Sequence, residues 1–74
     1  MHELSKYNYL IMIIWDDQRY LVSGWDYKED AQDSLDEILE FHPNNPYKAR
    51  IVYNSTGEYN NVPTNNYPYK ESKQ

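Results

Sequence analysis

The run of β-branched and aromatic residues from position 7 to position 15 predicts a β-strand. Apolar residues occupy both sets of alternating positions in the middle of this run, so both faces of the strand should be buried. One face is predicted to carry Tyr7, Tyr9, Ile11, Ile13 and Trp15, and the other Asn8, Leu10, Met12 and Ile14. A strand that is apolar on both faces belongs in the centre of a sheet.

Polar residues interrupt this pattern at positions 16–18, and alternation resumes from Arg19 to Gly24. Because aspartate favours turns, the two strands are expected to form a β-hairpin, after which Gly24 lets the chain bend away. A third alternating run, from Tyr47 to Tyr53, predicts another strand with one apolar and one basic face.

Between the second and third strands the apolar residues recur three or four positions apart, which predicts an amphipathic helix. Asp26 is the expected N-cap, with Glu29 three residues later as in a capping box. The helix should end near Phe41, because two prolines follow within five residues. Its apolar positions are Tyr27, Ala31, Leu35, Ile38, Leu39 and His42. We expect it to pack on the sheet through Ala31, Leu35, Ile38 and Leu39.

The element order β-β-α-β predicts a single small α+β domain over residues 1–53. The right-handed crossover preference places the third strand beside the first, so the predicted sheet has three antiparallel strands in the order 2-1-3. Residues 54–74 are rich in asparagine and tyrosine and poor in aliphatic residues, which predicts an extended or partly disordered tail. Within it, Glu58 to Val62 is a candidate for a short edge strand.

One helix covers only one face of a three-stranded sheet, so the other face needs a second cover. Two alternatives for what packs on this second face are the chain's own tail and a second copy of the chain in a homodimer. The tail residues available for this contact are Tyr59, Val62, Tyr67 and Tyr69. The candidate residues for a sheet-face interface are Tyr7, Tyr9, Trp15 and Tyr20.

The composition limits the classes of function. A chain of 74 residues without cysteine has a small core, no disulfide and no thiolate chemistry. The longest apolar run, from Leu10 to Trp15, is too short to span a bilayer, and the N-terminus lacks a signal-peptide pattern. We therefore expect a cytoplasmic protein that does not insert into membranes.

The net charge of −5 is concentrated in residues 16–41, which hold nine of the twelve acidic residues and only two basic ones. Seven of these acids recur on the outer face of the predicted helix: Asp26, Glu29, Asp30, Asp33, Asp36, Glu37 and Glu40. Acids near the helix end oppose the helix dipole, and like charges one turn apart each cost a few tenths of a kcal/mol. Folding does not require this arrangement, so it favours a surface that binds a basic partner, with a merely solvated surface as the alternative.

The residues expected to bind a basic protein surface are Glu29, Asp30, Asp33, Asp36, Glu37 and Glu40. Carboxylates repeated every turn lie about 5–6 Å apart. That spacing suits a protein surface evolved to bind phosphates, so a nucleic-acid-binding protein is one candidate partner. The chain would then act as its inhibitor or as a nucleic-acid mimic. Direct binding of nucleic acid is disfavoured by the negative charge.

The sequence predicts no catalytic or metal-binding site and no cofactor. Nothing in the sequence brings Ser23 or Ser34 to His42, the acid spacing lacks a calcium or zinc pattern, and two glycines cannot form a phosphate loop. The composition is similar to that of short accessory proteins of viruses and mobile elements, without a motif that identifies a family. The competing hypothesis is an assembly protein that forms homo-oligomers through its aromatic sheet face, with the acids serving solubility.

Overall fold

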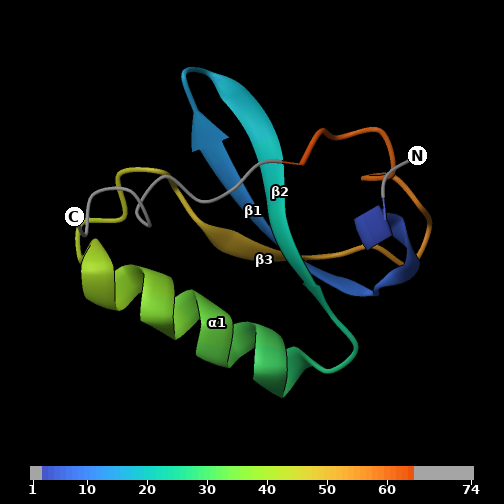
Figure 1. Ribbon diagram of the computed structural model, residues 1–74, viewed down its shortest axis with the longest axis horizontal. Coiled ribbons are helices and arrows are strands. Elements are labelled where there is room, and N and C mark those ends of the chain that lie inside the picture. The colour runs from blue at the N-terminus through green and yellow to red at the C-terminus, as the bar shows by residue number, and fades with distance from the viewer. Residues whose placement is uncertain (1–2, 65–74) are drawn as a thin grey trace.

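The sheet has the topology that the sequence predicted. The computed structural model describes residues 3–64, with the elements η1 (Glu3–Lys6, a 3-10 helix), β1 (Tyr9–Trp15), β2 (Gln18–Trp25), α1 (Lys28–Phe41) and β3 (Arg50–Tyr53). β1 pairs antiparallel with both β2 and β3, which gives the order β2-β1-β3 (Figure 1). The prediction of a three-stranded antiparallel sheet with one helix is confirmed.

The core lies on both faces of β1, as its two apolar faces indicated. The fully buried residues of this strand are Leu10, Ile11, Met12 and Ile13. On the helix side, the buried cluster consists of Ile11, Ile13, Ala31, Ile38 and Ala49. On the opposite side, it consists of Leu10, Met12, Leu21, Val52 and Val62. Removal of these side chains from water is the main term that stabilises the fold.

The helix packs on the sheet through part of its predicted apolar stripe. Ala31 and Ile38 are buried, and Leu35 is half-buried against the same cluster. Leu39 is half-buried but lies outside this cluster, and Tyr27 is 67% exposed. The buried face of α1 is therefore narrower than the pattern of apolar residues suggested.

The predicted capping box at Asp26 does not form. Tyr27 is the N-cap, with extended backbone angles (φ −121°, ψ 142°) and no side-chain cap hydrogen bond. Asp26 therefore precedes the cap, and Glu29 lies two residues after the cap instead of three, which is one short of the capping-box spacing. The C-terminal end agrees with the prediction, because α1 ends at Phe41 and the His42 N–H donates to the Ile38 carbonyl at 3.0 Å.

The hairpin turn is tighter than expected. Asp16 and Asp17 alone connect the strands, and both have positive φ (57° and 65°). Positive φ at both central residues is typical of the type I′ turn, whose twist matches that of the flanking strands. β2 then runs from Gln18 through Gly24 to Trp25, instead of ending at Gly24 as predicted.

A β-bulge changes the faces of β2. Ser23 and Leu21 pair with consecutive residues of β1, so the intervening Val22 has no partner there. A bulge of this kind places two neighbouring residues on one side of the strand. Val22 and Trp25 both pack against the helix-side cluster, although they are three positions apart.

The third strand is shorter than the predicted run from Tyr47 to Tyr53, because a loop uses its first residues. Asn45 and Lys48 have positive φ (49° and 51°). The Asn45 side chain accepts a hydrogen bond from the Ala49 N–H at 2.8 Å and donates one to the Ala49 carbonyl at 3.2 Å. Asparagine tolerates this conformation better than most residues.

The second face of the sheet is covered by residues from both ends of the described chain. Buried Val62 packs there, and the half-buried residues around this cluster are Leu4, Tyr7 and Tyr59. The Leu21 N–H donates to the Pro63 carbonyl at 2.8 Å, and Leu21 forms a parallel bridge with Thr64, so this segment also covers the outer edge of β2 at Leu21. In Figure 1, α1 and the orange segment that ends at residue 64 lie on opposite sides of β2.

The predicted contact of the tail with the sheet is therefore present for Tyr59 and Val62, whereas Tyr67 and Tyr69 lie outside the described residues. Residues 58–61 form turns and Val62 lies in a bend, so the expected edge strand is absent and the contact with β2 comes later, at Thr64. Self-association through this face stays a prediction, although its apolar residues already contact the chain's own segments. Among residues 3–64, no helix has the length and apolar character needed to cross a bilayer.

Candidate functional site: an acidic groove between α1 and β2

The carboxylates assigned to partner binding lie on the solvent side of α1. All six are exposed: Glu29, Asp30, Asp33, Asp36, Glu37 and Glu40. At 3.6 residues per turn, these positions share about a third of the helix circumference. No basic residue lies in the last turn of the helix, so the negative charge of the acids there is not balanced within that turn.

The structure separates these carboxylates into two sets. Asp30, Asp33 and Glu37 line a groove of about 550 Å³ between α1 and β2, whereas Glu29, Asp36 and Glu40 do not. Of the second set, Asp36 accepts a hydrogen bond from Gln32 Nε2 at 2.9 Å. The carboxylates of the first set are therefore the ones that can act together with residues of the sheet.

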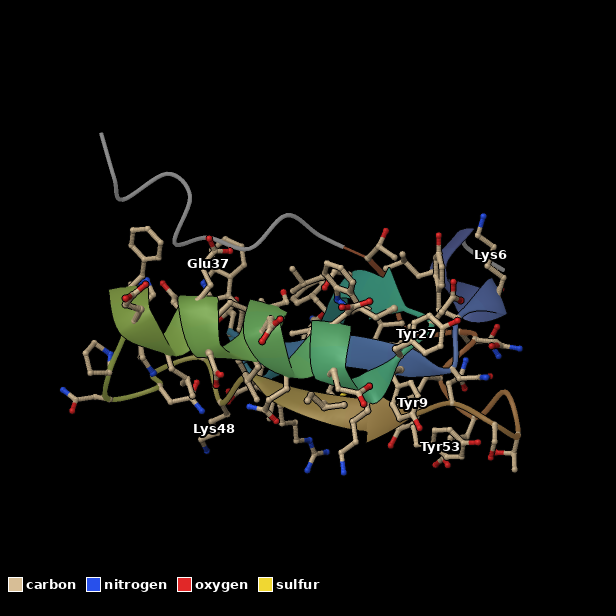
Figure 2. The ribbon with its side chains drawn as sticks, turned by 90° about the horizontal axis from the view of Figure 1, so that it is seen from below. Lys6, Tyr9, Tyr27, Glu37, Lys48 and Tyr53 are labelled. Atoms are coloured by element: carbon tan, nitrogen blue, oxygen red, sulfur yellow. The ribbon has the colours of Figure 1, made fainter. Side chains whose placement is uncertain are left out.

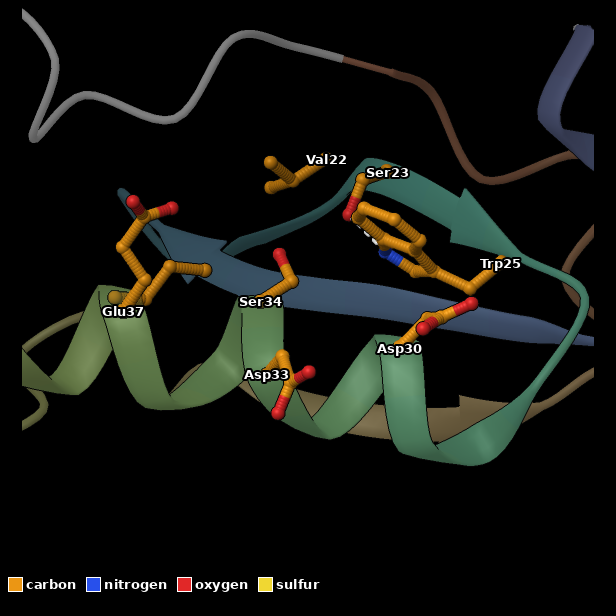
Figure 3. Close-up of a pocket in the computed structure, with 8 residues that line it drawn as sticks. Val22, Ser23, Trp25, Asp30, Asp33, Ser34 and Glu37 are labelled. Atoms are coloured by element: carbon orange, nitrogen blue, oxygen red, sulfur yellow. Dashed lines mark hydrogen bonds between the residues drawn. The ribbon is translucent and has the colours of Figure 1, made fainter.

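The β2 wall of the groove is made by the bulged part of the strand. It consists of Val22, Ser23 and Trp25, facing Asp30, Asp33, Ser34, Glu37 and Ile38 of α1 (Figure 3). Figure 3 shows the Trp25 ring beside Asp30 at one end of the groove and Glu37 at the other end. The groove thus combines an apolar and aromatic wall with an anionic rim.

Trp25 is held in place by a hydrogen bond and by packing. Its indole Nε1 donates to Ser23 Oγ at 2.8 Å, and its ring is half-buried against the helix-side cluster. An aromatic face next to carboxylates suits a lysine or arginine side chain, whose alkyl part packs on apolar surface while its charge meets the ring and the acids. The groove is a candidate site for such a side chain.

The groove carboxylates are not paired with basic residues of the described chain. Among residues 3–64, none of the three groove carboxylates forms an ion pair. Figure 2 shows Glu37 on one side of the helix and Lys48 on the other. The mutual repulsion of the groove carboxylates is therefore not relieved by the basic residues of this part of the chain.

The aromatic residues predicted to form a sheet-face interface do not share one face. Tyr9 and Tyr20 pack on the helix side and Tyr7 on the opposite side. Trp15 is 41% exposed at the hairpin end, with its ring centroid 6.4 Å from that of Tyr20. Tyr7 changes sides because the chain bends at Asn8 before β1 begins, so the alternation does not extend to it.

The serines and His42 are not combined into a catalytic arrangement. Ser23 and Ser34 line the groove, whereas His42 does not and packs edge-on against Tyr47, with ring centroids 5.4 Å apart. Among the described residues, no group of three or more acidic and histidine side chains could hold a metal ion.

The alternating pattern of the sequence did not predict the β2 half of the groove. Strict alternation places Val22 and Ser23 on opposite faces, and only the bulge makes both line the groove. Gly24 is the one local signal that pointed to it, because an isolated glycine in a strand often marks a bulge. Comparison with known protein families, curated proteins and solved structures finds no match for this chain.

Proposed function

We propose that this chain is a non-catalytic interaction module that binds a basic protein surface through the acidic face of α1, with the α1–β2 groove receiving a lysine or arginine side chain of the partner. The observation that carries the proposal is the groove itself: Asp30, Asp33 and Glu37 rim an open hollow walled by Trp25, without an ion pair among residues 3–64.

The binding free energy is expected to come from several weak surface ion pairs around one stronger contact in the groove. An exposed ion pair contributes only about 0.2–1 kcal/mol, so the outer carboxylates mainly steer the partner during encounter. A cation partly desolvated against Trp25 contributes more, up to about 2 kcal/mol. The partner that best fits is a nucleic-acid-binding protein, since its basic surface already accepts rows of negative charge.

Two matched triple variants test the proposal. In the groove variant, Asp30, Asp33 and Glu37 become lysine; in the control, Glu29, Asp36 and Glu40 become lysine. Each variant changes three charges by two units, so both move the net charge from −5 to +1. Proteins captured from the native host are identified by mass spectrometry, and each purified basic candidate is then titrated with the three forms by calorimetry.

We expect the groove variant to lose at least about a hundredfold in affinity and the control to lose markedly less, because only the first removes the contacts around the inserted cation. Association of the parent should slow steeply with salt, since exposed charges act over about 8 Å at physiological ionic strength. A nucleic-acid ligand of the partner should compete with this chain. Equal losses for the two variants would show that charge alone matters, and unchanged affinity in both would contradict the proposal.

A further inference from the structure

Among residues 3–64, no strand pairs with the outer edge of β3. Its pairing with β1 shows which backbone groups point outward. The Asn54 N–H donates to the Asn8 carbonyl at 2.7 Å, and the same register pairs Val52 with Leu10. In an antiparallel ladder, hydrogen-bonded and non-bonded pairs alternate. Val52 and Asn54 occupy hydrogen-bonded positions, so Ile51 and Tyr53 occupy the non-bonded ones. The N–H and C=O groups of Ile51 and Tyr53 therefore point away from β1.

Two further observations support this assignment. The rings of Tyr9 and Tyr53, which face each other across the strands, have centroids 5.1 Å apart, as expected for the closer side chains of a non-bonded pair. Among residues 3–64, no hydrogen bond joins the outward groups of Ile51 and Tyr53. The outer edge of β2, by contrast, is partly covered, because the Leu21 N–H donates to the Pro63 carbonyl.

The side chains around this edge form an apolar and basic surface. A hollow of about 350 Å³ is lined by Tyr9, Lys28, Ile51 and Tyr53, without a carboxylate. Tyr53 is 55% exposed, and Arg50 is exposed at the opposite end of the strand. Figure 2 shows Tyr9 and Tyr53 close together at one end of the molecule, and Lys48 on the same side of α1 farther along.

We propose that the β3 edge binds an extended peptide that alternates apolar and acidic side chains and adds to the sheet as a fourth strand. In antiparallel alignment, the four outward groups of Ile51 and Tyr53 all find partners on the peptide backbone. The two peptide residues opposite them place apolar side chains toward the hollow. The peptide carboxylate opposite Arg50 lies on the face of the sheet that Arg50 shares with Val52 and meets the Arg50 side chain, while Lys28 adds positive charge beside the hollow on the other face.

A second copy of this chain is a poorer occupant. In an edge-to-edge dimer, both copies bring Lys28 and Arg50 to the interface, so like charges meet there. The strand has four residues, too short an edge to supply the roughly 800 Å² per partner that a stable dimer buries. The β3 edge and the acidic groove lie on different sides of α1 and have opposite charge, so this inference stands apart from the proposed function.

The test is a titration of the full-length ¹⁵N-labelled protein with an acetylated and amidated peptide of sequence Glu-Val-Thr-Val-Glu, followed by amide NMR spectra. We expect saturable shifts that are largest at the Ile51 and Tyr53 amides and smaller at Val52, whose N–H already faces β1. The peptide Lys-Val-Thr-Val-Lys should bind at least about tenfold more weakly, because its charges oppose Lys28 and Arg50.

Protein variants complete the test. Lys28→Glu with Arg50→Glu should weaken binding of the acidic peptide about tenfold or more. The matched control, Lys6→Glu with Arg19→Glu, makes the same change in net charge away from the edge and should bind like the parent. The NMR spectrum of each variant shows directly whether its fold is kept.

Three results would overturn the inference. The first is an absence of saturable shifts at Ile51 and Tyr53. The second is equal binding of the acidic and basic peptides. The third is a concentration-dependent shift of these two amides without peptide, accompanied by sedimentation as a dimer, which would assign the edge to a second copy.

Discussion

Replacement of Gly24 by alanine tests how the N-terminal segment packs on β2. A Cβ atom added to Gly24 would lie 2.8 Å from Tyr7 Cγ and 3.0 Å from Tyr7 Cβ, with Tyr7 Cδ2 nearer still. Because one of these atoms is the Cβ of Tyr7, rotation of the ring alone does not remove the clash. The backbone that carries Tyr7, whose N–H donates to the Leu4 carbonyl at 3.1 Å, must also move.

Two effects of opposite sign decide how much Gly24→Ala changes the free energy of unfolding. Insertion of a methyl group into a packed site typically costs about 1–3 kcal/mol. Glycine-to-alanine replacement where φ is not positive stabilises by about 0.4–1 kcal/mol, because it restricts the unfolded chain. Among the described glycines only Gly57 has positive φ, so this second effect applies at Gly24. The net expectation is a loss of about 1–2 kcal/mol in the free energy of unfolding.

Urea denaturation followed by tryptophan fluorescence measures this loss. The decisive control repeats Gly24→Ala in a Tyr7→Gly background, where both the obstructing ring and its Cβ atom are absent. There the same replacement should stabilise the protein by about 0.4–1 kcal/mol, so its sign reverses. If Gly24→Ala is neutral or stabilising with Tyr7 present, the proposed packing of Tyr7 over β2 is wrong.

Three further predictions concern stability and are checked by the same urea denaturation. Ile38→Ala should cost about 2–4 kcal/mol, and Leu35→Ala distinctly less, because Ile38 is 2% exposed and Leu35 is only half-buried; equal losses would contradict this assignment. Asp16→Asn with Asp17→Gly should stabilise by about 1 kcal/mol, since Asn-Gly is the preferred pair for positive φ at both positions; a loss of stability would argue against the type I′ turn. Asn54→Ala should cost about 1–3 kcal/mol, because this buried side chain bonds the loop that follows β3; a loss below about 0.5 kcal/mol would show that the loop does not depend on it.

Local pattern in the sequence was enough to predict the three paired strands, the helix and their topology. The doubly apolar run around Ile11 identified the central strand, because burial on both faces needs a neighbour on each side. The helical period of the acids predicted that residues such as Asp33 and Glu37 are exposed, since their position on the helix depends only on spacing. These features are local or depend on simple rules of chain connection.

Tertiary contacts decided the rest. The bulge at Val22 depends on how β2 aligns with β1, and strand register cannot be read from either strand alone. It sets Trp25 beside the helix and so selects Asp30, Asp33 and Glu37 as the carboxylates that share a groove with the sheet. The open edge at Ile51 has the same origin, since a backbone group is free or paired according to the position of the next strand. The sequence determined that α1 carries an acidic face, and packing decided which part of that face acts together with the sheet.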